Sequence, residues 1–267
     1  MITNNPFSTL SEIVPSVAMQ GFLITMIALV VIGTLVDIIH KKNVKYFFEN
    51  AKKAKKSATK ELGTGERVSV IAKTVVYDIG TTSELGAGKR RVAHLLGMYG
   101  TILFWIASAV LVFCYSSSSS VAPSAWPIIW HVGAIMTVVG GSWFWFFLRV
   151  DVYSEAQPWY RIIKADLFVL ALISTSLFGL IWSYLQSLNL SDNRWDDKLF
   201  LVLYVVSNLV LFGGVYWSKF AHMFYKPGAA IQKNLAEADG SRDNLPPEAD
   251  APEKFGLGIK RESPKHY

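Results

Sequence analysis

Long apolar runs separated by short polar connections dominate the chain, and this pattern predicts membrane-spanning helices. A bilayer core of about 30 Å needs roughly 20 apolar residues in one helix. The runs that meet this requirement are Ser16–Ile39, Val92–Tyr115, Trp126–Leu148, Ala165–Leu185 and Leu199–Phe220. The chain is therefore predicted to be an all-α integral membrane protein, built as a five-helix bundle. No basic region precedes the first run and no small-residue cleavage site follows it, so we expect a retained helix.

Composition supports a membrane protein and excludes several other classes. Apolar residues make up 52% of the chain and charged residues 17%, with a mean hydropathy of +0.32. Ordinary soluble domains carry about 25% charged residues. Disordered, collagen-like and nucleic-acid-binding proteins are excluded by this balance. The single cysteine, Cys114, rules out an internal disulfide, a cysteine-ligated zinc site or an iron–sulfur cluster within one copy.

The basic residues are concentrated in the connections that follow the first and third runs. Residues 41–91 hold 13 Lys and Arg against 5 Asp and Glu, whereas Ser116–Ala125 carries no charge. The third connection, Arg149–Lys164, is also basic at both ends. By the positive-inside rule, the N-terminus lies outside and these two loops and the C-terminal tail are cytoplasmic. We expect a multi-pass protein of a bacterial inner membrane, and the net charge of +6 needs no nucleic acid partner.

The same pattern divides the chain into three predicted parts. These are a periplasmic arm over 1–15, a transmembrane domain over 16–222 that includes the cytoplasmic loop 41–91, and an extended tail over 223–267. Within the loop, 43–62 is predicted to be a lysine-rich helix that binds either membrane lipid or an acidic partner. In the tail, the apolar segment Phe255–Ile259 is either a docking segment or part of a disordered region.

The chain has no recognisable catalytic motif, and its candidate functional residues are histidines. No Ser/His/Asp arrangement, HExxH, Walker or dinucleotide-binding motif is present. Ionisable residues in or beside membrane helices are functional candidates. His40, His94 and His222 are predicted near the cytoplasmic face, and His131 lies about five residues into the third run from outside. For His131, a hydrogen bond to a quinone carbonyl, an unusual haem ligand and a helix cap stay open.

A haem held between two helices needs two imidazoles at similar depth, and His94 and His222 meet this condition. Gly97 and Gly100 follow His94 within two turns and leave room for a flat macrocycle. His222 is predicted to end the fifth helix, on the same stripe as Tyr204. The basic residues expected to pair with haem propionates are Arg90, Arg91 and Lys219. The alternative for each helix-end histidine is an interfacial polar residue.

Two segments around these histidines resemble a family of membrane cytochromes b. Arg90–Gly100 is similar to the Arg…His…aromatic-Gly start of the family's second helix. Trp217–Pro227 is similar to the Ser-Lys/Arg-x-x-His-x-aromatic-x-x-Pro ending of its last helix. The family includes the gamma subunit of respiratory nitrate reductase and the cytochrome b subunit of heterodisulfide reductase. In size and layout the chain most resembles the membrane anchor associated with adenylylsulfate reductase.

The resemblance implies a b-type haem near the cytoplasmic face, with His94 and His222 as its iron ligands. Members with two haems carry further histidines where this chain has Phe104 and Tyr204. The resemblance therefore carries over one haem and leaves a second, with an unusual ligand, open.

The expected function is that of a membrane subunit in a redox complex. It would transfer electrons between a cytoplasmic iron–sulfur flavoprotein, such as adenylylsulfate reductase, and membrane quinone. Such a subunit is either non-catalytic or itself reacts with quinone. The alternative is a haem-free anchor for a soluble oxidoreductase with direct quinone contact. A small transporter is disfavoured because the remaining charges, Asp37, Asp166 and Lys219, all lie near the inner boundary.

Overall fold

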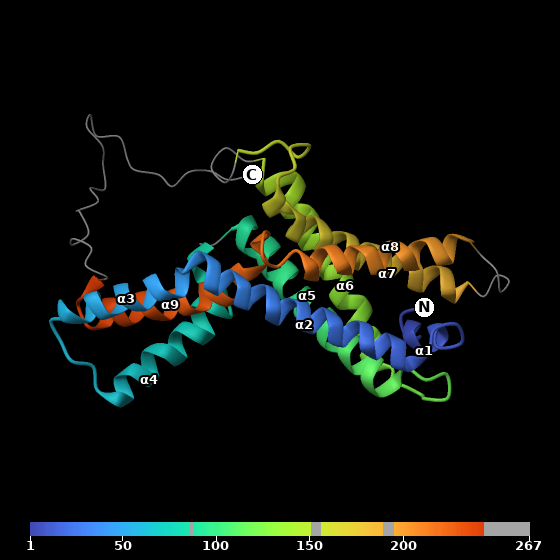
Figure 1. Cartoon of the computed structure of the whole chain (residues 1–267), viewed down its shortest axis with the longest axis horizontal. Helices are drawn as coiled ribbons and strands as arrows, with labels where there is room; N and C mark the ends of the chain where they lie inside the picture. Colours follow the sequence, from blue (N-terminus) through green and yellow to red (C-terminus); the bar gives the residue numbers. More distant parts are fainter. Residues whose placement is uncertain (86–87, 151–155, 189–194, 243–267) are drawn as a thin grey trace.

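The computed structural model describes residues 1–85, 88–150, 156–188 and 195–242, and every regular element in these ranges is helical (Figure 1). The α-helices are α1 (Pro6–Leu10), α2 (Ser16–Lys41), α3 (Asn43–Lys56), α4 (Thr64–Lys73), α5 (Lys89–Tyr115), α6 (Ala125–Trp143), α7 (Leu167–Ser187), α8 (Trp195–Gly213) and α9 (His222–Ala238). Shorter 3-10 and π segments are η1 (Thr74–Ile79), η2 (Ser83–Leu85), η3 (Phe144–Leu148), η4 (Lys164–Asp166) and η5 (Lys219–Ala221).

Four of the five predicted spans are confirmed as helices long and apolar enough to cross a bilayer. They are α2, α5, α6 continued by η3, and η4 continued by α7. Each agrees with its predicted run to within about three residues. The chain is therefore a multi-pass membrane protein by the length and composition of its helices.

The fifth predicted span ends earlier than the hydropathy pattern indicated. Helix α8 stops at Gly213, at a pair of glycines, and the chain turns before Ser218. Ser218 has an extended backbone (ψ 177°), and its Oγ accepts a hydrogen bond from the Phe220 amide at 3.2 Å. His222 therefore begins α9 and does not share a helical stripe with Tyr204. At 1.5 Å per residue α8 is about 28 Å long, and its acidic first turn lowers its apolar character. A fifth crossing stays a prediction.

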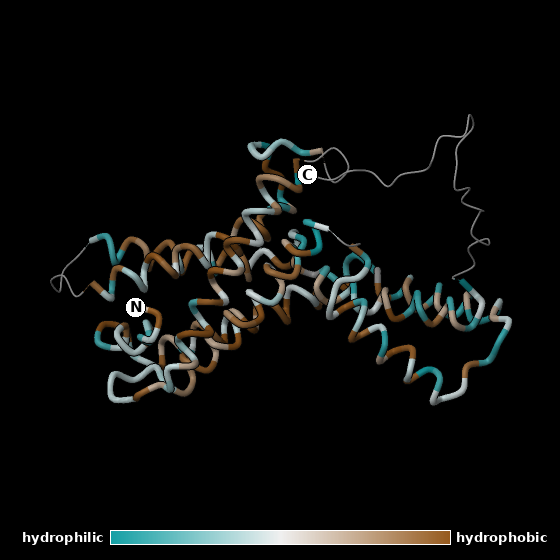
Figure 2. Tube along the Cα trace, turned by 180° about the vertical axis from the view of Figure 1, so that it is seen from behind, coloured by the Kyte–Doolittle hydropathy of each residue, from teal (hydrophilic) through white to brown (hydrophobic). Residues whose placement is uncertain are grey.

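The elements sort into two ends of the bundle (Figure 1). Helix α1, the 116–124 loop and the end of α7 lie at one end, which we call the arm end. Helices α3, α4 and α9 gather with η1 at the other, and we call these four elements the platform. Figure 2 shows mostly apolar residues along the bundle and a mixture of polar and apolar ones on the platform. That the platform faces the cytoplasm stays a prediction from the positive-inside rule.

The platform corrects the predicted extended tail. Residues 223–238 belong to α9, which packs against α3, α4 and η1. Asn234 Nδ2 donates to Thr74 Oγ1 at 2.8 Å and to Asp78 Oδ2 at 2.6 Å, and Ala230 and Ala236 are buried. A helix with one small apolar face is stable here because its neighbours cover that face. The predicted 43–62 helix ends at Lys56, and Phe255–Ile259 lies outside the described residues.

The arm folds back on the bundle and closes its arm end. Asn5 Nδ2 donates to the Tyr115 carbonyl at 2.7 Å, and Phe7 is buried. The Phe7 ring lies edge-on to Trp130 and Trp182, with centroid distances of 6.0 and 5.9 Å. The predicted periplasmic arm is thus part of the packed structure, because its apolar residues complete the core between α5, α6 and α7.

Helices α5 and α6 touch backbone to backbone through glycines. A Cβ added at Gly140 would lie 2.4 Å from the Gly97 amide nitrogen. A Cβ added at Gly133 would lie 2.6 Å from the Phe104 amide nitrogen. Small residues permit this close approach, which favours van der Waals contact between helices in lipid.

Candidate functional site

The structure places the predicted histidines in three different environments. His40, His94 and His222 lie at the platform end, where α2 ends and α5 and α9 begin. His131 lies inside the bundle toward the arm end and is fully buried. His40 is exposed, with its ring edge-on to Tyr216 at 5.9 Å. His266 lies outside the described residues.

His222 is held in a defined orientation at the first residue of α9. Its Nδ1 hydrogen-bonds the Lys219 carbonyl, and its ring lies edge-on to Phe168 at 5.5 Å. Since a carbonyl only accepts, Nδ1 carries the proton and Nε2 keeps its lone pair. Partial burial, together with nearby Lys226 and Lys219, lowers the pKa of His222. A neutral imidazole whose second nitrogen donates to a carbonyl is the usual state of a metal-ligating histidine.

His94 lies in the second turn of α5, and its side chain is exposed. The charges that act on it most strongly belong to Lys226, His222 and Arg90. His94, on α5, therefore lies within electrostatic reach of His222, on α9, and their pairing as ligands stays a prediction. Lys226 was missed, because its place one turn after His222 has meaning only once α9 is a helix.

The predicted propionate partners differ in what they contact. Arg91 donates from Nε to the Thr81 carbonyl at 2.7 Å and from Nη2 to Thr81 Oγ1 at 2.6 Å, which ties η1 to α5. Arg90 is exposed beside His94. Lys219 lines a pocket together with His222. The guanidinium of Arg91 therefore holds the loop, and the roles expected of Arg90 and Lys219 stay predictions.

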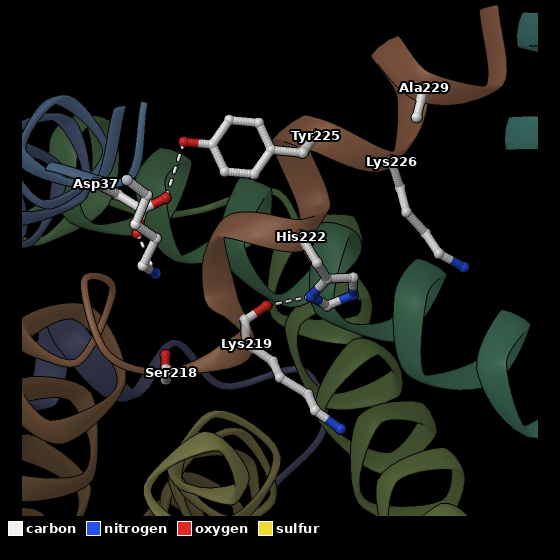
Figure 3. Close-up of a pocket in the computed structure, with 8 residues that line it drawn as sticks. Asp37, Ser218, Lys219, His222, Tyr225, Lys226 and Ala229 are labelled. Atoms are coloured by element: carbon white, nitrogen blue, oxygen red, sulfur yellow. Dashed lines mark hydrogen bonds and ion pairs between the residues drawn. The ribbon is translucent and has the colours of Figure 1, made fainter. Parts of the chain in front are cut away.

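An open pocket of about 350 Å³ lies between the last turn of α2 and the first turns of α9 (Figure 3). Its lining residues are Asp37, Lys41, Ser218, Lys219, His222, Tyr225, Lys226 and Ala229. The Tyr225 hydroxyl donates to Asp37 Oδ2 at 2.9 Å, and Lys41 pairs with the same carboxylate. Burial and the Asp37 carboxylate raise the pKa of Tyr225 to about 12, so this hydroxyl stays protonated. In Figure 3 Lys219, His222 and Lys226 extend away from Asp37.

The two glycines expected to leave room for a macrocycle have different surroundings. A Cβ at Gly97 would meet no atom within 4 Å. A Cβ at Gly100 would lie 2.6 Å from the Thr137 amide nitrogen and 2.8 Å from the Gly133 carbonyl oxygen. The expectation is wrong for Gly100, because α6 already occupies that face of α5.

His131 uses both ring nitrogens within the protein. Nδ1 donates to the Pro127 carbonyl at 2.7 Å, so Nε2 accepts the 2.8 Å hydrogen bond from Ser183 Oγ. This geometry joins α6 to α7, a role not among the three predicted for His131, and both ring nitrogens are used in it.

Phe104 and Tyr204 lie in the aromatic core near the arm end. Phe104 packs on Trp130 with a centroid distance of 5.1 Å. Tyr204 stacks on Trp182 at 5.7 Å. Both side chains are buried and fill the space between the helices.

The comparisons with known proteins found no matching family model, no matching curated protein and no matching solved structure. Within the described ranges, no three His, Cys, Asp or Glu side chains gather into a metal-binding cluster. The candidate site therefore depends on two histidines and the cations around them.

Proposed function

We propose that the chain is the membrane subunit of a redox complex in a bacterial inner membrane. It transfers electrons between a cytoplasmic iron–sulfur flavoprotein, of the adenylylsulfate reductase type, and the membrane quinone pool. One b-type haem near the platform end, with His94 and His222 as axial ligands, provides the path. The observation that carries the proposal is the orientation of His222, whose Nε2 lone pair lies in the same charged neighbourhood as His94.

The residues around His94 and His222 fit a b-type haem. His222 is neutral, oriented by a carbonyl and partly buried, and the open space beside Gly97 lies one turn from His94. Arg90 and Lys219 supply positive charge for propionates at the edge of the bundle. Bound haem supplies one-electron redox chemistry, whose potential depends on its ligands and its burial.

The protein's own residues would orient the two ligands and shield one side of the site. The Lys219 carbonyl fixes the His222 ring, and Phe168 covers one edge of it. Arg91 holds η1 against the start of α5, which keeps His94 in register with α9. The packing of α9 on α4 and η1 sets the position of His222 relative to α5.

A basic platform surface supports docking of a soluble partner. Exposed lysines line α3, namely Lys45, Lys52, Lys53, Lys55 and Lys56. Helix α3 continues beyond the end of α2 at the side of α9, away from the bundle (Figure 1). This placement favours an acidic protein surface over a lipid surface as its partner. Because the chain has one cysteine, the partner would supply any iron–sulfur cluster.

An optical spectrum of the full chain, purified with mild detergent, tests the haem. Dithionite should produce a reduced b-type band that His222→Ala and His94→Ala each abolish. His40→Ala is the matched control, since it removes an exposed histidine at the same end and should leave the band unchanged.

Three results would contradict the haem assignment: no band in the wild type, a band insensitive to both substitutions, or equal loss in His40→Ala. If the wild type shows no band but co-purifies with a cluster-bearing flavoprotein, the haem-free anchor replaces the redox path.

A further inference from the structure

Helix α4 and the η1 segment that continues it carry an apolar stripe that no other described part of the chain covers. The stripe consists of Val68, Ile71, Val75 and Val76. All four side chains are exposed, Val68 by 61% and Val76 by 70%. Their spacing of three, four and one residues places them on one side of a helix. Another side packs on α9, where Thr74 is buried and accepts a hydrogen bond.

Hydrogen bonds hold the end of η1 against the first turns of α5. The Tyr99 hydroxyl donates to the Gly80 carbonyl at 2.6 Å, one residue after η1 ends. Arg91 donates to the carbonyl and the hydroxyl of Thr81, the next residue. The apolar stripe is therefore tied to α5, which is long and apolar enough to cross a bilayer.

Tyr99 belongs to a side of α5 that faces lipid. The side chains of Val92, Tyr99 and Ile106 are all exposed and repeat every seven residues, whereas α6 packs on another side, at Gly100. Helix α5 has 27 residues and is about 40 Å long, so about 5 Å of a centred helix extends beyond a 30 Å core at each end. Tyr99 lies about 15 Å from the start of α5, inside that core. Bilayer lipid, not a soluble protein, occupies the space beside this side of a spanning helix.

We propose that α4 and η1 form an interfacial helix whose stripe enters the boundary between the lipid headgroups and the acyl chains. Interfacial helices of this kind bury their apolar side by about 5–10 Å. Figure 1 shows α4 leading back from the tip of the platform toward the start of α5, so η1 is the part nearest the bilayer. Arg67 and Lys73 lie outside the stripe and are exposed, as the polar side of such a helix requires. The proposal does not require haem and is independent of the proposed function.

The test measures how fast introduced cysteines react with a water-soluble maleimide when the full chain is in lipid nanodiscs, which leave both membrane faces open to the reagent. Cys114→Ser removes the one native cysteine and is the background for every variant. Val76→Cys should react at least about tenfold more slowly than Lys73→Cys, because burial of even one valine favours the inserted state by about this factor. Lys73→Cys is the matched control, three residues earlier and outside the stripe. Val68→Cys, further from the bundle, should react at an intermediate rate.

A fluorophore attached to the same cysteines gives a second measurement. Lipids that carry a spin label on the acyl chain should quench it more strongly at Val76→Cys than at Lys73→Cys. Equal reaction rates and equal quenching at these two positions would overturn the proposal. Protection of Val76→Cys that arises only when a soluble protein is added, or only when a nanodisc holds two copies of the chain, would assign the stripe to that partner instead. The unfolding temperature of each variant shows that it is folded.

Discussion

Replacing Gly100 with alanine tests the close contact between α5 and α6. The new Cβ would lie 2.6 Å from the Thr137 amide nitrogen, 2.7 Å from Met136 Cβ and 2.8 Å from the Gly133 carbonyl oxygen. Ordinary contact begins near 3.4 Å, so the nearest gap is short by about 0.8 Å. Two of these three atoms belong to the α6 backbone, and no side-chain rotation relieves the overlap. The helices must therefore move apart.

Overpacking of this kind costs about 1–3 kcal/mol. One kcal/mol lowers the unfolding temperature of a chain of about this size by about 2–4 °C, so Gly100→Ala should unfold about 2–12 °C below the wild type. Thermal unfolding of the full chain in detergent, followed by near-ultraviolet circular dichroism, measures the shift. Gly21→Ala on α2 is the control, because its Cβ meets no atom within 4 Å.

Gly97 gives the matched contrast on the same helix. Its added Cβ meets no atom within 4 Å, so Gly97→Ala should unfold close to the wild-type temperature. Gly97→Leu fills the space beside His94 and should reduce the b-type band without the stability loss of Gly100→Ala. An unshifted unfolding temperature in Gly100→Ala, or an equal loss in Gly97→Ala, would refute the assignment of Gly100 to helix packing.

Two further predictions concern charged groups away from the candidate site. Arg149 Nη2 and Asp166 Oδ2 form a buried pair at 2.6 Å, so Asp166→Asn should cost about 3–5 kcal/mol in urea unfolding. Glu237→Gln, which breaks an exposed pair with Lys233, should cost under about 1 kcal/mol; similar losses would contradict this difference. Hydrogen bonds from Ser83 and Asn234 lower the pKa of Asp78 from 3.8. Asp78 therefore adds stability above pH 3.8 that disappears as pH falls through its lower folded-state pKa. Limited proteolysis at a series of acidic pH values measures the unfolding of the platform. The pH dependence that Asp78 contributes should be absent in Asp78→Asn, and an acid transition equal to that of the wild type would disprove this role of Asp78.

The spans were predictable because hydropathy depends on local composition, and the four confirmed helices agree with their runs. The end of α8 was not predictable in this way, because Gly214 to Trp217, which follow it, carry no charge and continue the apolar run. The helix ends at the Gly213-Gly214 pair, and Ser218 caps the start of the next element, η5. Helix α9 was missed because its stability depends on distant parts of the chain. Its sequence mixes charged, polar and apolar residues, and it is held by contacts with residues such as Thr74 and Asp78, over 150 residues away in the chain.

At the candidate site, too, the types of the functional residues could be predicted from the sequence, whereas the neighbours of each residue could not. His94 and His222 were proposed from side-chain chemistry and approximate depth, which are features that the sequence displays. Arg91 and Gly100 were assigned to the cofactor because they lie near His94 in the sequence. The structure gives them neighbours that sequence does not reveal, the Thr81 carbonyl for Arg91 and the α6 backbone for Gly100.

The two ends of the bundle differ in what they can hold, and this difference bears on the number of cofactors. Toward the arm end, Phe104 and Tyr204 are buried among Trp130 and Trp182. A second macrocycle there would have to displace these packed aromatic side chains and the van der Waals contacts they make. At the platform end the imidazole of His222 is only partly buried, the space beside Gly97 is open, and cations surround both histidines. This packing therefore agrees better with the one haem proposed at the platform end than with a second haem near the arm end.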